Sequence, residues 1–438
     1  MGKRVVVTGV LLGVATAAVY LIGSNRCFGY DSAVTFANFI ATPSLWDAFA
    51  VRSVQPTIPL STIAGNDHVL LSFLSHVIYS ATGSRSEVVY RLLPALAGGG
   101  TVGLTTCALA QRFGLLAGVC AGLFIATDPL FVENSRDLRG YSLATLGALV
   151  ATLILASRWT RWRLFAYAVV LGLAIATHLF VIVVLPVHIA WIATRRSWQQ
   201  LRQLAPAWML AAAIGVAANA HIRVLEFVEH GSPAGVFYPT FPRDLVLFLV
   251  GAPVLLTVGL WLSTAGLGLW RLRAEPWMWA AVAVVAVVVA VLWLGLRPAY
   301  LYPRFFIFLV PACALLMAAA IARWKVLAAV VVAGAAFAAW SQAPLYTEDP
   351  LALPQAAAAV ERIHAAGQRA CVIHSDEQVL AAYTNDFTVV LAPDQLAGCD
   401  AVVVVSWGVD LSLRDLAAQE FPRATALYAY YPAVVLER

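Results

Sequence analysis

The chain has 438 residues, of which 61% are hydrophobic and 12% charged, and its formal net charge is +5. Soluble domains carry about 25% charged residues, so this composition excludes an ordinary soluble domain. Repeated apolar stretches of about 20 residues are typical of transmembrane helices.

These stretches predict an all-α polytopic membrane protein. The eleven expected helices lie at about residues 5–23, 88–111, 114–131, 140–157, 164–177, 179–194, 203–221, 244–270, 277–296, 304–322 and 326–343. The first stretch follows Lys3 and Arg4 and looks like a signal peptide, but no small-residue cleavage site is evident before Asp31. We therefore expect it to be retained as a helix.

The distribution of charge predicts the orientation. With the N-terminus in the cytoplasm, the inner loops hold one acid, Glu275, and thirteen basic residues: Lys3, Arg4, Arg112, Arg158, Arg161, Arg163, Arg195, Arg196, Arg202, Arg271, Arg273, Arg323 and Lys325. Cytoplasmic loops of membrane proteins carry such an excess of Lys and Arg. The expected location is the plasma or inner cell membrane, with a cytoplasmic N-terminus and an extracytoplasmic C-terminal domain.

Two segments interrupt the apolar pattern. The outer loop 24–87 contains a short helix at about 66–79, which we expect to lie along the outer surface as interfacial amphipathic helices do. Residues 344–438 are polar enough to form a small α/β domain, and residues 1–343 are expected to form the transmembrane domain. The helices of the small domain are expected at 353–366, 377–383 and 413–419 and its strands at 370–374, 388–391, 401–406 and 424–430, in a partly parallel sheet.

The cysteines give one open alternative and no metal site. Cys371 and Cys399 both lie in the outer domain, where an oxidising compartment permits a disulfide, and two free thiols are the alternative. No cysteine or histidine spacing resembles a zinc site, so no metal ligand is predicted and no cofactor is expected with certainty. A divalent cation stays an open alternative.

Polar and ionisable side chains gather on the outer side of the predicted bundle. Polar groups at membrane depth are costly, so such a cluster indicates a functional site. Its members are Asp31, Asn66, Asp67, His68, Arg136, Asp137, Arg139, His178, Arg297 and Arg304. Guanidinium groups match phosphate oxygens, and a carboxylate can take a proton from an attacking hydroxyl.

Several of these residues stand in motifs with a fixed order along the chain. They are Asp31 just after the first helix, Asn66-Asp67-His68-Val69-Leu70-Leu71, Arg91-Leu-Leu-Pro94, Ser135-Arg136-Asp137-Leu138-Arg139-Gly140-Tyr141-Ser142-Leu143, Thr177-His178 and Tyr302-Pro303-Arg304-Phe305-Phe306. Over roughly residues 1–325 the chain resembles the polytopic glycosyltransferases with the GT-C fold. It is most similar to the protein mannosyltransferase-like and aminoarabinose transferase-like enzymes, including the RgtA/B/C/D-like branch.

The resemblance implies an inverting glycosyltransferase that takes a sugar from a polyprenyl-phosphate donor on the extracytoplasmic face. It implies that Asp31 is the general base or a group that orients the acceptor, that Arg136, Arg139 and Arg304 bind the donor phosphate, and that His68 and His178 line the site. Asn66 and Asp67 join them as substrate-binding candidates. The residue after Asp31 is Ser32, whereas members of this group often carry a second acid there, which weakens the case for a metal between adjacent carboxylates.

Each residue also has a structural interpretation. Asp31 and Asp67 could be helix caps, and capping is favoured for Asp67. Arg304 could anchor at the interface, and His178 could hydrogen-bond the main chain of its turn. One of Arg136 and Arg139 is expected to face the site, with Arg136 preferred.

The function expected is therefore membrane-bound transfer of a sugar to an acceptor hydroxyl. The expected partners are a polyprenyl-phosphate-linked sugar, membrane lipids and an acceptor glycolipid, polysaccharide or protein, with no nucleic acid. The alternatives are a transporter or lipid flippase, and an inactive GT-C relative that acts as a binding protein. Transporters tend to show inverted repeats and midplane polar residues, and neither is evident in the sequence.

Overall fold

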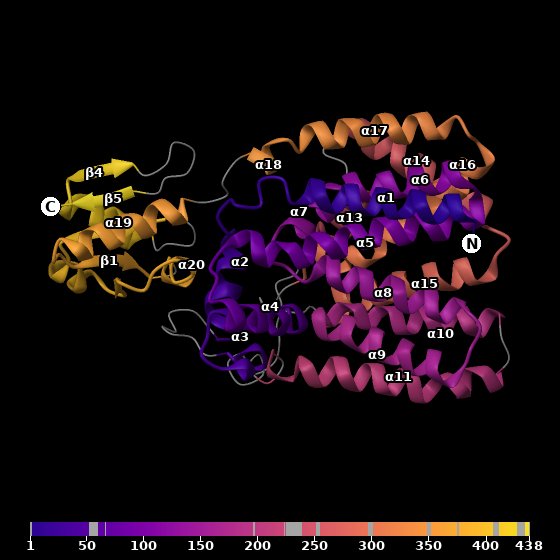
Figure 1. Cartoon of the computed structure of the whole chain (residues 1–438), viewed down its shortest axis with the longest axis horizontal. Coiled ribbons are helices and arrows are strands. Elements are labelled where there is room, and N and C mark those ends of the chain that lie inside the picture. The colour runs from indigo at the N-terminus through magenta and orange to yellow at the C-terminus, as the bar shows by residue number, and fades with distance from the viewer. Residues whose placement is uncertain are drawn as a thin grey trace.

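The fold was analysed in a computed structural model, which describes residues 2–51, 60–65, 67–195, 198–222, 224, 239–250, 255–296, 301–347, 352–374, 376–405, 411–426 and 434–437. A long helical bundle carries a small α/β domain at one end, and the N-terminus lies at the other end (Figure 1). The helices of the bundle are α1 (Lys3–Tyr20), α5 (Glu87–Phe113), α6 (Leu115–Thr127), α7 (Pro129–Arg136), α8 (Tyr141–Ala156), α9 (Arg161–Thr177), η3 (Leu179–Val183), α10 (Val184–Arg195), α11 (Trp198–Ala218), α13 (Phe241–Val250), α14 (Leu255–Arg271), α15 (Pro276–Ala290), η4 (Val291–Leu296), η5 (Pro303–Leu309), α16 (Val310–Arg323) and α17 (Leu327–Ser341).

Some of these helices are long and apolar enough to cross a membrane by themselves. Among the described residues, five are long and apolar enough to cross a membrane, or six if the bent pair α6 and α7 counts as one span. The sequence predicts an unbroken helix at 114–131, but the chain turns by 61° between α6 and α7. Asp128 accepts a hydrogen bond from the Phe131 amide at 2.8 Å, and Pro129 disfavours a helical residue before it. Helix α7 therefore begins at Pro129 and runs in a new direction.

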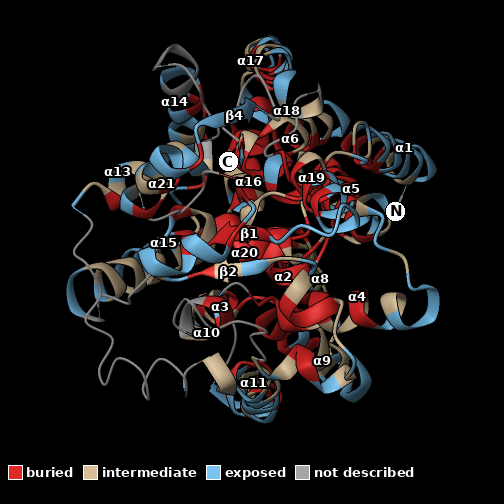
Figure 2. Ribbon diagram, turned by 90° about the vertical axis from the view of Figure 1, so that its left-hand side faces the viewer, coloured by how far each residue is buried: buried red, intermediate tan, exposed pale blue. Residues whose placement is uncertain are grey.

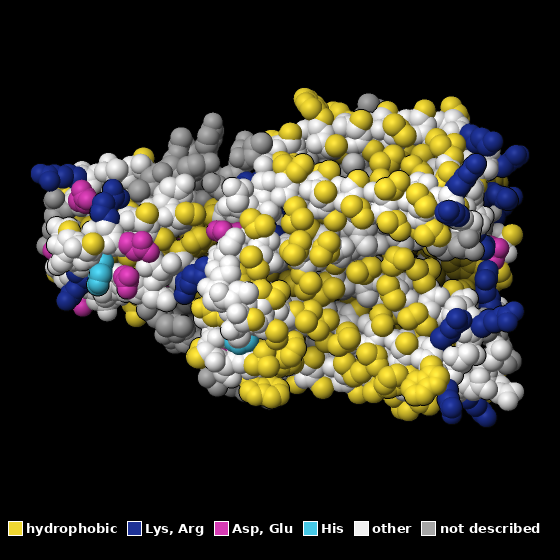
Figure 3. All heavy atoms as spheres, in the orientation of Figure 1, with side chains coloured by type: hydrophobic (Ala, Val, Ile, Leu, Met, Phe, Trp, Pro, Cys, Tyr) yellow, Lys and Arg dark blue, Asp and Glu magenta, His cyan; other side chains and the backbone are white. Residues whose placement is uncertain are grey.

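The surface of the bundle matches a membrane protein with one basic end. Figure 3 shows hydrophobic side chains over most of the visible face of the bundle and a concentration of Lys and Arg at the end far from the α/β domain. The acid Glu275 lies at 2.8 Å from Arg195 and 3.8 Å from Arg112. Residues from three loops predicted to share the inner side thus meet at one end of the molecule.

Helices α1 and α5 cross at very short range because glycines face each other. A Cβ on Gly13 would lie 2.7 Å from the Gly99 carbonyl oxygen, and a Cβ on Gly9 would lie 2.8 Å from that of Gly103. Small residues four apart permit such close packing of membrane helices. The contact fixes the outer end of α1 beside α5 and so sets where the first outer loop begins.

The first outer loop folds into short helices at the end of the bundle that carries the α/β domain (Figure 1). They are α2 (Tyr30–Thr35), the π-helix η1 (Phe36–Ile40), the 3₁₀ helix η2 (Leu45–Phe49), α3 (Leu60–Ala64) and α4 (Val69–Thr82). The helix expected at about 66–79 is α4, which begins at Val69 and ends at Gly83 with a positive φ of 62°. The expectation that it lies along the membrane surface stays a prediction.

Arg91 of α5 holds the start of this loop. Its guanidinium donates to the carbonyl oxygens of Ser24 at 2.9 Å and Cys27 at 2.8 Å, and also to that of Arg26. It lies 3.6 Å from Asp137 and is only 3% exposed. One buried cation thereby ties the loop that precedes Asp31 to the segment that follows α7.

The C-terminal domain has the α/β architecture expected from the sequence. It follows α18 (Pro344–Thr347), and its elements are α19 (Leu353–Ala365), β1 (Ala370–Ile373), α20 (Glu377–Leu380), β2 (Thr388–Val390), η6 (Pro393–Gly398), β3 (Ala401–Val404), α21 (Leu411–Glu420), β4 (Arg423–Ala426) and β5 (Val434–Glu437). The strand order is β2-β1-β3-β5-β4; β1 pairs in parallel with β2 and β3, and β5 runs antiparallel to β3 and β4. Strand β5 is not predicted from the sequence, because its apolar stretch is only four residues long. Cys371 and Cys399 form a disulfide.

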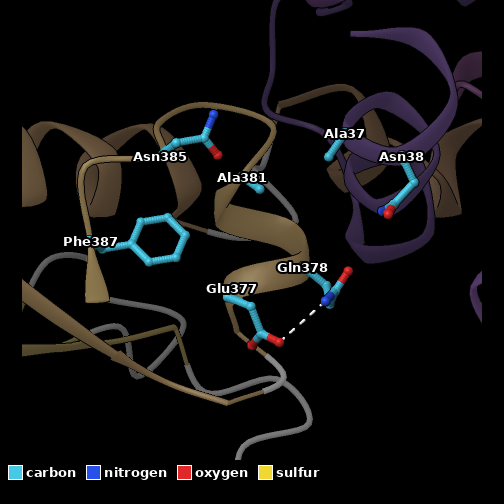
Figure 4. A pocket seen from close by; sticks show the side chains of 7 residues that line it. All are labelled: Ala37, Asn38, Glu377, Gln378, Ala381, Asn385 and Phe387. Atoms are coloured by element: carbon cyan, nitrogen blue, oxygen red, sulfur yellow. Dashed lines mark hydrogen bonds between the residues drawn. The ribbon is translucent and has the colours of Figure 1, made fainter. Parts of the chain in front are cut away.

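The α/β domain packs on the first outer loop and forms a common core with it. Buried residues of α2 and η1 belong to the same hydrophobic cluster as buried residues of α19 and the sheet, and α2 packs directly on α20. Figure 2 shows buried segments at α2 and α20. A small hollow lies at this contact, lined by Ala37 and Asn38 from η1 and by Glu377, Gln378, Ala381, Asn385 and Phe387 from the domain (Figure 4). The domain therefore helps to hold the helix that carries Asp31.

Tyr383 gives a direct test of this packing. Its hydroxyl accepts a hydrogen bond from the Phe28 amide and donates one to Glu87, both at 2.8 Å. Tyr383→Phe removes both bonds and is expected to lower the free energy of unfolding by about 1–3 kcal/mol. Hydrogen exchange at residues 27–36 should accelerate, and unchanged protection there would contradict the coupling.

Candidate active site

The Asp31 carboxylate lies between two guanidinium groups from distant parts of the chain. Its Oδ2 atom is 3.2 Å from the Nη2 atom of Arg304 and 3.6 Å from the Nη2 atom of Arg139. The Asp31 side chain is 27% exposed and that of Arg304 36%, whereas Arg139 is 5% exposed. The cluster is thus reachable from solvent on one side and embedded in protein on the other.

Local structure explains why these three side chains meet. Asp31 is in the first turn of α2, where a carboxylate is stabilised by the helix dipole. The Ser32 hydroxyl faces the Leu138 carbonyl at 3.5 Å and ties α2 to the segment 137–140. Arg304 stands at the start of η5, directly after Pro303, and its guanidinium lies over the Tyr302 ring at 4.9 Å. Asp31 and Arg304 therefore lie at the starts of two short helices, and Arg139 lies in the short segment between α7 and α8.

Arg136 lies elsewhere, which reverses the preference from sequence. Its guanidinium donates to the carbonyl oxygens of Tyr20 at 3.1 Å and Ile22 at 2.8 Å and stacks over the Tyr346 ring at 3.6 Å. These carbonyls belong to the last turn of α1 and the residues after it, where unpaired acceptors attract a cation. Of the two arginines on this segment, Arg139 is the one beside Asp31.

Two histidines form the buried wall next to Arg139. The rings of His68 and His178 are 5.7 Å apart, and each packs edge-on against Tyr141 at 4.7 and 4.9 Å. A Cβ on Gly140 would lie 2.8 Å from the Cβ of His68, so only glycine permits this approach. The structure brings together the two histidines that the sequence singled out.

The protonation of this pair predicts how stability depends on pH. Burial and the nearby Arg139 hold the pKa of His68 well below its usual value, and the same causes lower the pKa of His178. The unfolded chain therefore binds more protons than the folded chain below about pH 6.5, so stability is full above that pH and is lost as pH falls. Each histidine contributes up to about 1.4 kcal/mol per pH unit. Thermal unfolding at pH 7.5 and 5.0 checks this, and His68→Asn should reduce the difference.

Asp67 has a different role from the capping that the sequence favoured. Helix α4 begins after His68, and the fully buried Asp67 carboxylate instead accepts from the Ser72 hydroxyl at 2.6 Å and contacts His221 at 3.2 Å. Burial raises the pKa of Asp67, and His221 and Ser72 oppose that shift. The capping interpretation was wrong because the side chain points into the protein. Asn66 and Arg297 lie outside the described residues.

Sequence reasoning did not single out two residues that the fold brings near the cluster. His221 follows α11 and reaches Asp67 across the outer end of the bundle. Glu133, on α7, is exposed and interacts electrostatically with Arg304 and Asp31. Glu133 could have been found from the sequence, because it lies two positions before Ser135 in the junction between two predicted helices. Nothing in the sequence around His221 indicated that this histidine lies near the cluster.

The arrangement combines an accessible carboxylate, two guanidinium groups and two buried imidazoles. Within the part of the chain that the structure describes, no group of three or more His, Cys, Asp and Glu side chains is arranged to hold a metal ion. Two guanidinium groups facing one carboxylate leave a positive excess where an anion can bind. The carboxylate can accept a proton from a hydroxyl that approaches from the exposed side.

The fold places the chain among known structures. No protein-family model and no curated protein matches the sequence. The structure is similar to that of ArnT from Cupriavidus metallidurans in the apo state, with a TM-score of 0.66 and 15% identity over 98% of this chain and 97% of that one. The same protein bound to undecaprenyl phosphate gives a TM-score of 0.62, at 15% identity and the same coverage. The arabinofuranosyltransferase AftD from Mycobacteria gives 0.54, at 14% identity over 97% of this chain and 40% of that one.

ArnT and AftD are GT-C glycosyltransferases. This chain has the GT-C fold, a bundle of apolar helices with a small C-terminal sheet.

Proposed function

We propose that this chain is an integral membrane glycosyltransferase that moves a sugar from a polyprenyl-phosphate donor to an acceptor hydroxyl, with Asp31 as the general base. The observation that carries the proposal is the position of the Asp31 carboxylate between Arg139 and Arg304, at 3.6 and 3.2 Å. The fold adds support because a similar structure contains undecaprenyl phosphate.

The charges of this cluster suit a phosphate that becomes more negative during the reaction. Arg139 and Arg304 together carry two positive charges against the single charge of Asp31. Guanidinium groups bind phosphate oxygens with charge-assisted hydrogen bonds. Fixed positive groups stabilise charge that develops on a leaving group, so the two arginines favour departure of the polyprenyl phosphate.

The reaction follows from these roles. The acceptor oxygen forms a bond to the anomeric carbon while the bond from that carbon to the phosphate oxygen breaks. The phosphate leaves with the bonding electron pair, and the acceptor proton passes to Asp31. A single displacement of this kind inverts the configuration at the anomeric carbon.

The proposed orientation follows from the two ends of the bundle. The basic end, with Arg112 and Arg195 around Glu275, would face the cytoplasm. The end that carries Asp31 and the α/β domain would then lie on the extracytoplasmic side. The acceptor would approach Asp31 from that side, where its carboxylate is partly exposed.

The direct test uses purified protein in lipid nanodiscs. Binding of undecaprenyl phosphate is measured first, and polyprenyl-phosphate sugars are then supplied with cell-envelope lipids and polysaccharides as acceptors. We expect release of polyprenyl phosphate together with glycosylated acceptor. Asp415→Asn, which changes an exposed acid of the α/β domain, is the matched control and should behave as the unmodified protein.

Two outcomes would reject the proposal. The first is no binding of undecaprenyl phosphate by folded protein. The second is binding and movement of the lipid between leaflets without sugar transfer from any donor, which would support a flippase instead.

A further inference from the structure

The two buried histidines beside Arg139 differ from His188, which is also buried. His188 has both ring nitrogens occupied, with Nδ1 2.9 Å from the Tyr167 hydroxyl and Nε2 3.0 Å from that of Thr152. The Nε2 atoms of His68 and His178 are buried and have no hydrogen-bond partner among the described residues. His68 is 2% exposed and His178 9%.

The tautomer of His68 follows from its partner. Its Nδ1 lies 3.1 Å from the Thr177 carbonyl oxygen, which only accepts, so Nδ1 carries the proton. The neutral ring then presents a lone pair at Nε2. Burial and Arg139 keep the ring neutral by lowering its pKa.

His178 lies beside His68. The two ring centroids are 5.7 Å apart, and the Nε2 atom of His178 is also buried without a hydrogen-bond partner among the described residues. Burial and Arg139 lower the pKa of His178, so this ring is neutral too. A hydroxyl group can pair with that Nε2 atom in either tautomer of the ring, because a hydroxyl both donates and accepts.

A buried acceptor without a donor costs about 1–3 kcal/mol, so each such atom in a native protein indicates a missing partner. Phosphate oxygens only accept from these groups and cannot satisfy an imidazole lone pair. A hydroxyl group can donate to that lone pair and can also accept a hydrogen bond from a guanidinium group. The Nε atom of Arg304 is such a donor, since it is buried and lacks a partner within the described residues. Arg304 and Arg139 both interact electrostatically with the two histidines.

We propose that His68 and His178 form a subsite that binds hydroxyl groups of the donor sugar through their Nε2 atoms, beside the arginines that hold the phosphate. The inference rests on the proposed function, because it divides one donor between two sets of side chains. It assigns the imidazoles to the sugar and not to the phosphate.

The test compares two ligands in two variants. His68→Asn and His178→Asn keep a donor near the Nδ1 position and remove the Nε2 atom. Binding of undecaprenyl phosphate without a sugar should stay within about twofold of the unmodified protein. Binding of the polyprenyl-phosphate sugar should weaken by about 5–100-fold, which corresponds to about 1–3 kcal/mol.

The matched control is His188→Asn, which also removes a buried imidazole but breaks bonds within the protein. It should lower thermal stability without changing the preference for the sugar-bearing lipid. Equal weakening of both lipids in the His68 and His178 variants would overturn the proposal, and so would unchanged binding of both.

A donor analogue tests the same point in the unmodified protein. Fluorine in place of a sugar hydroxyl can accept but cannot donate, so at least one fluorinated donor should bind about 5–100-fold more weakly. If every fluorinated donor bound as tightly as the hydroxyl form, the subsite would be rejected. Absence of lipid-phosphate binding by the unmodified protein would instead reject the proposed function itself.

Discussion

Replacing Asp31 by Asn is expected to reduce sugar transfer by about 10²–10⁴-fold, the usual contribution of a general base. The amide keeps the shape of the carboxylate but cannot take the acceptor proton. It also no longer pairs with Arg139 and Arg304, which lie 3.6 and 3.2 Å from Oδ2. Because partly exposed ion pairs are worth about 0.2–1 kcal/mol each, the affinity for undecaprenyl phosphate should rise by about two- to tenfold.

The combination of lower turnover and tighter lipid binding separates a base from a structural carboxylate. If Asp31 only positioned the arginines, the substitution would weaken binding of the lipid. Transfer at the rate of the unmodified protein would exclude the role of base. Asp137→Asn is a comparison variant, because Asp137 pairs at 3.6 Å with Arg91 instead, and its main effect should be on stability.

Arg304→Gln is expected to weaken lipid binding, whereas Arg136→Gln is expected to lower the stability of the fold. Loss of the Arg304 guanidinium should weaken binding of undecaprenyl phosphate by about 10–100-fold, since charge-assisted hydrogen bonds contribute about 1.5–3 kcal/mol. Loss of the Arg136 guanidinium should lower the free energy of unfolding by about 2–4 kcal/mol, because the carbonyls after α1 lose their donor. Lipid titration and thermal unfolding of both variants in one detergent check the pair.

The two measurements act as controls for each other. Arg304→Gln should unfold within a few degrees of the unmodified protein, because its side chain is 36% exposed. Folded Arg136→Gln protein should bind the lipid normally. The assignment would be contradicted if Arg136→Gln lost lipid binding while its stability was unchanged.

The sequence predicted the features that depend on local composition. The apolar stretches indicated a helical membrane bundle, and the alternating pattern after residue 350 indicated an α/β domain with a partly parallel sheet; both are confirmed. Helix ends were less accurate. The turn at Asp128-Pro129 was missed because an apolar stretch continues through it, and β5 was missed because four residues carry too little pattern.

The candidate site was predicted only in part, for a related reason. The sequence identified Asp31, His68, His178, Arg139 and Arg304 as residues of one side, because sidedness follows from loop charge. It preferred Arg136 to Arg139, since the two are only three positions apart and no periodicity distinguishes the directions of their side chains. The turn after α7 decides that Arg136 reaches the end of α1 and that Arg139 faces Asp31.

The sequence by itself therefore determined that this is a helical membrane protein with its candidate site residues on one side, because hydrophobicity and charge act along the chain. Only the tertiary structure decided which of those residues meet. The partners of Asp31 are 108 and 273 positions away in sequence (139 − 31 and 304 − 31). Their distances depend on the close packing of α1 on α5 and on the short helices at the end of the bundle, and no local pattern specifies such packing.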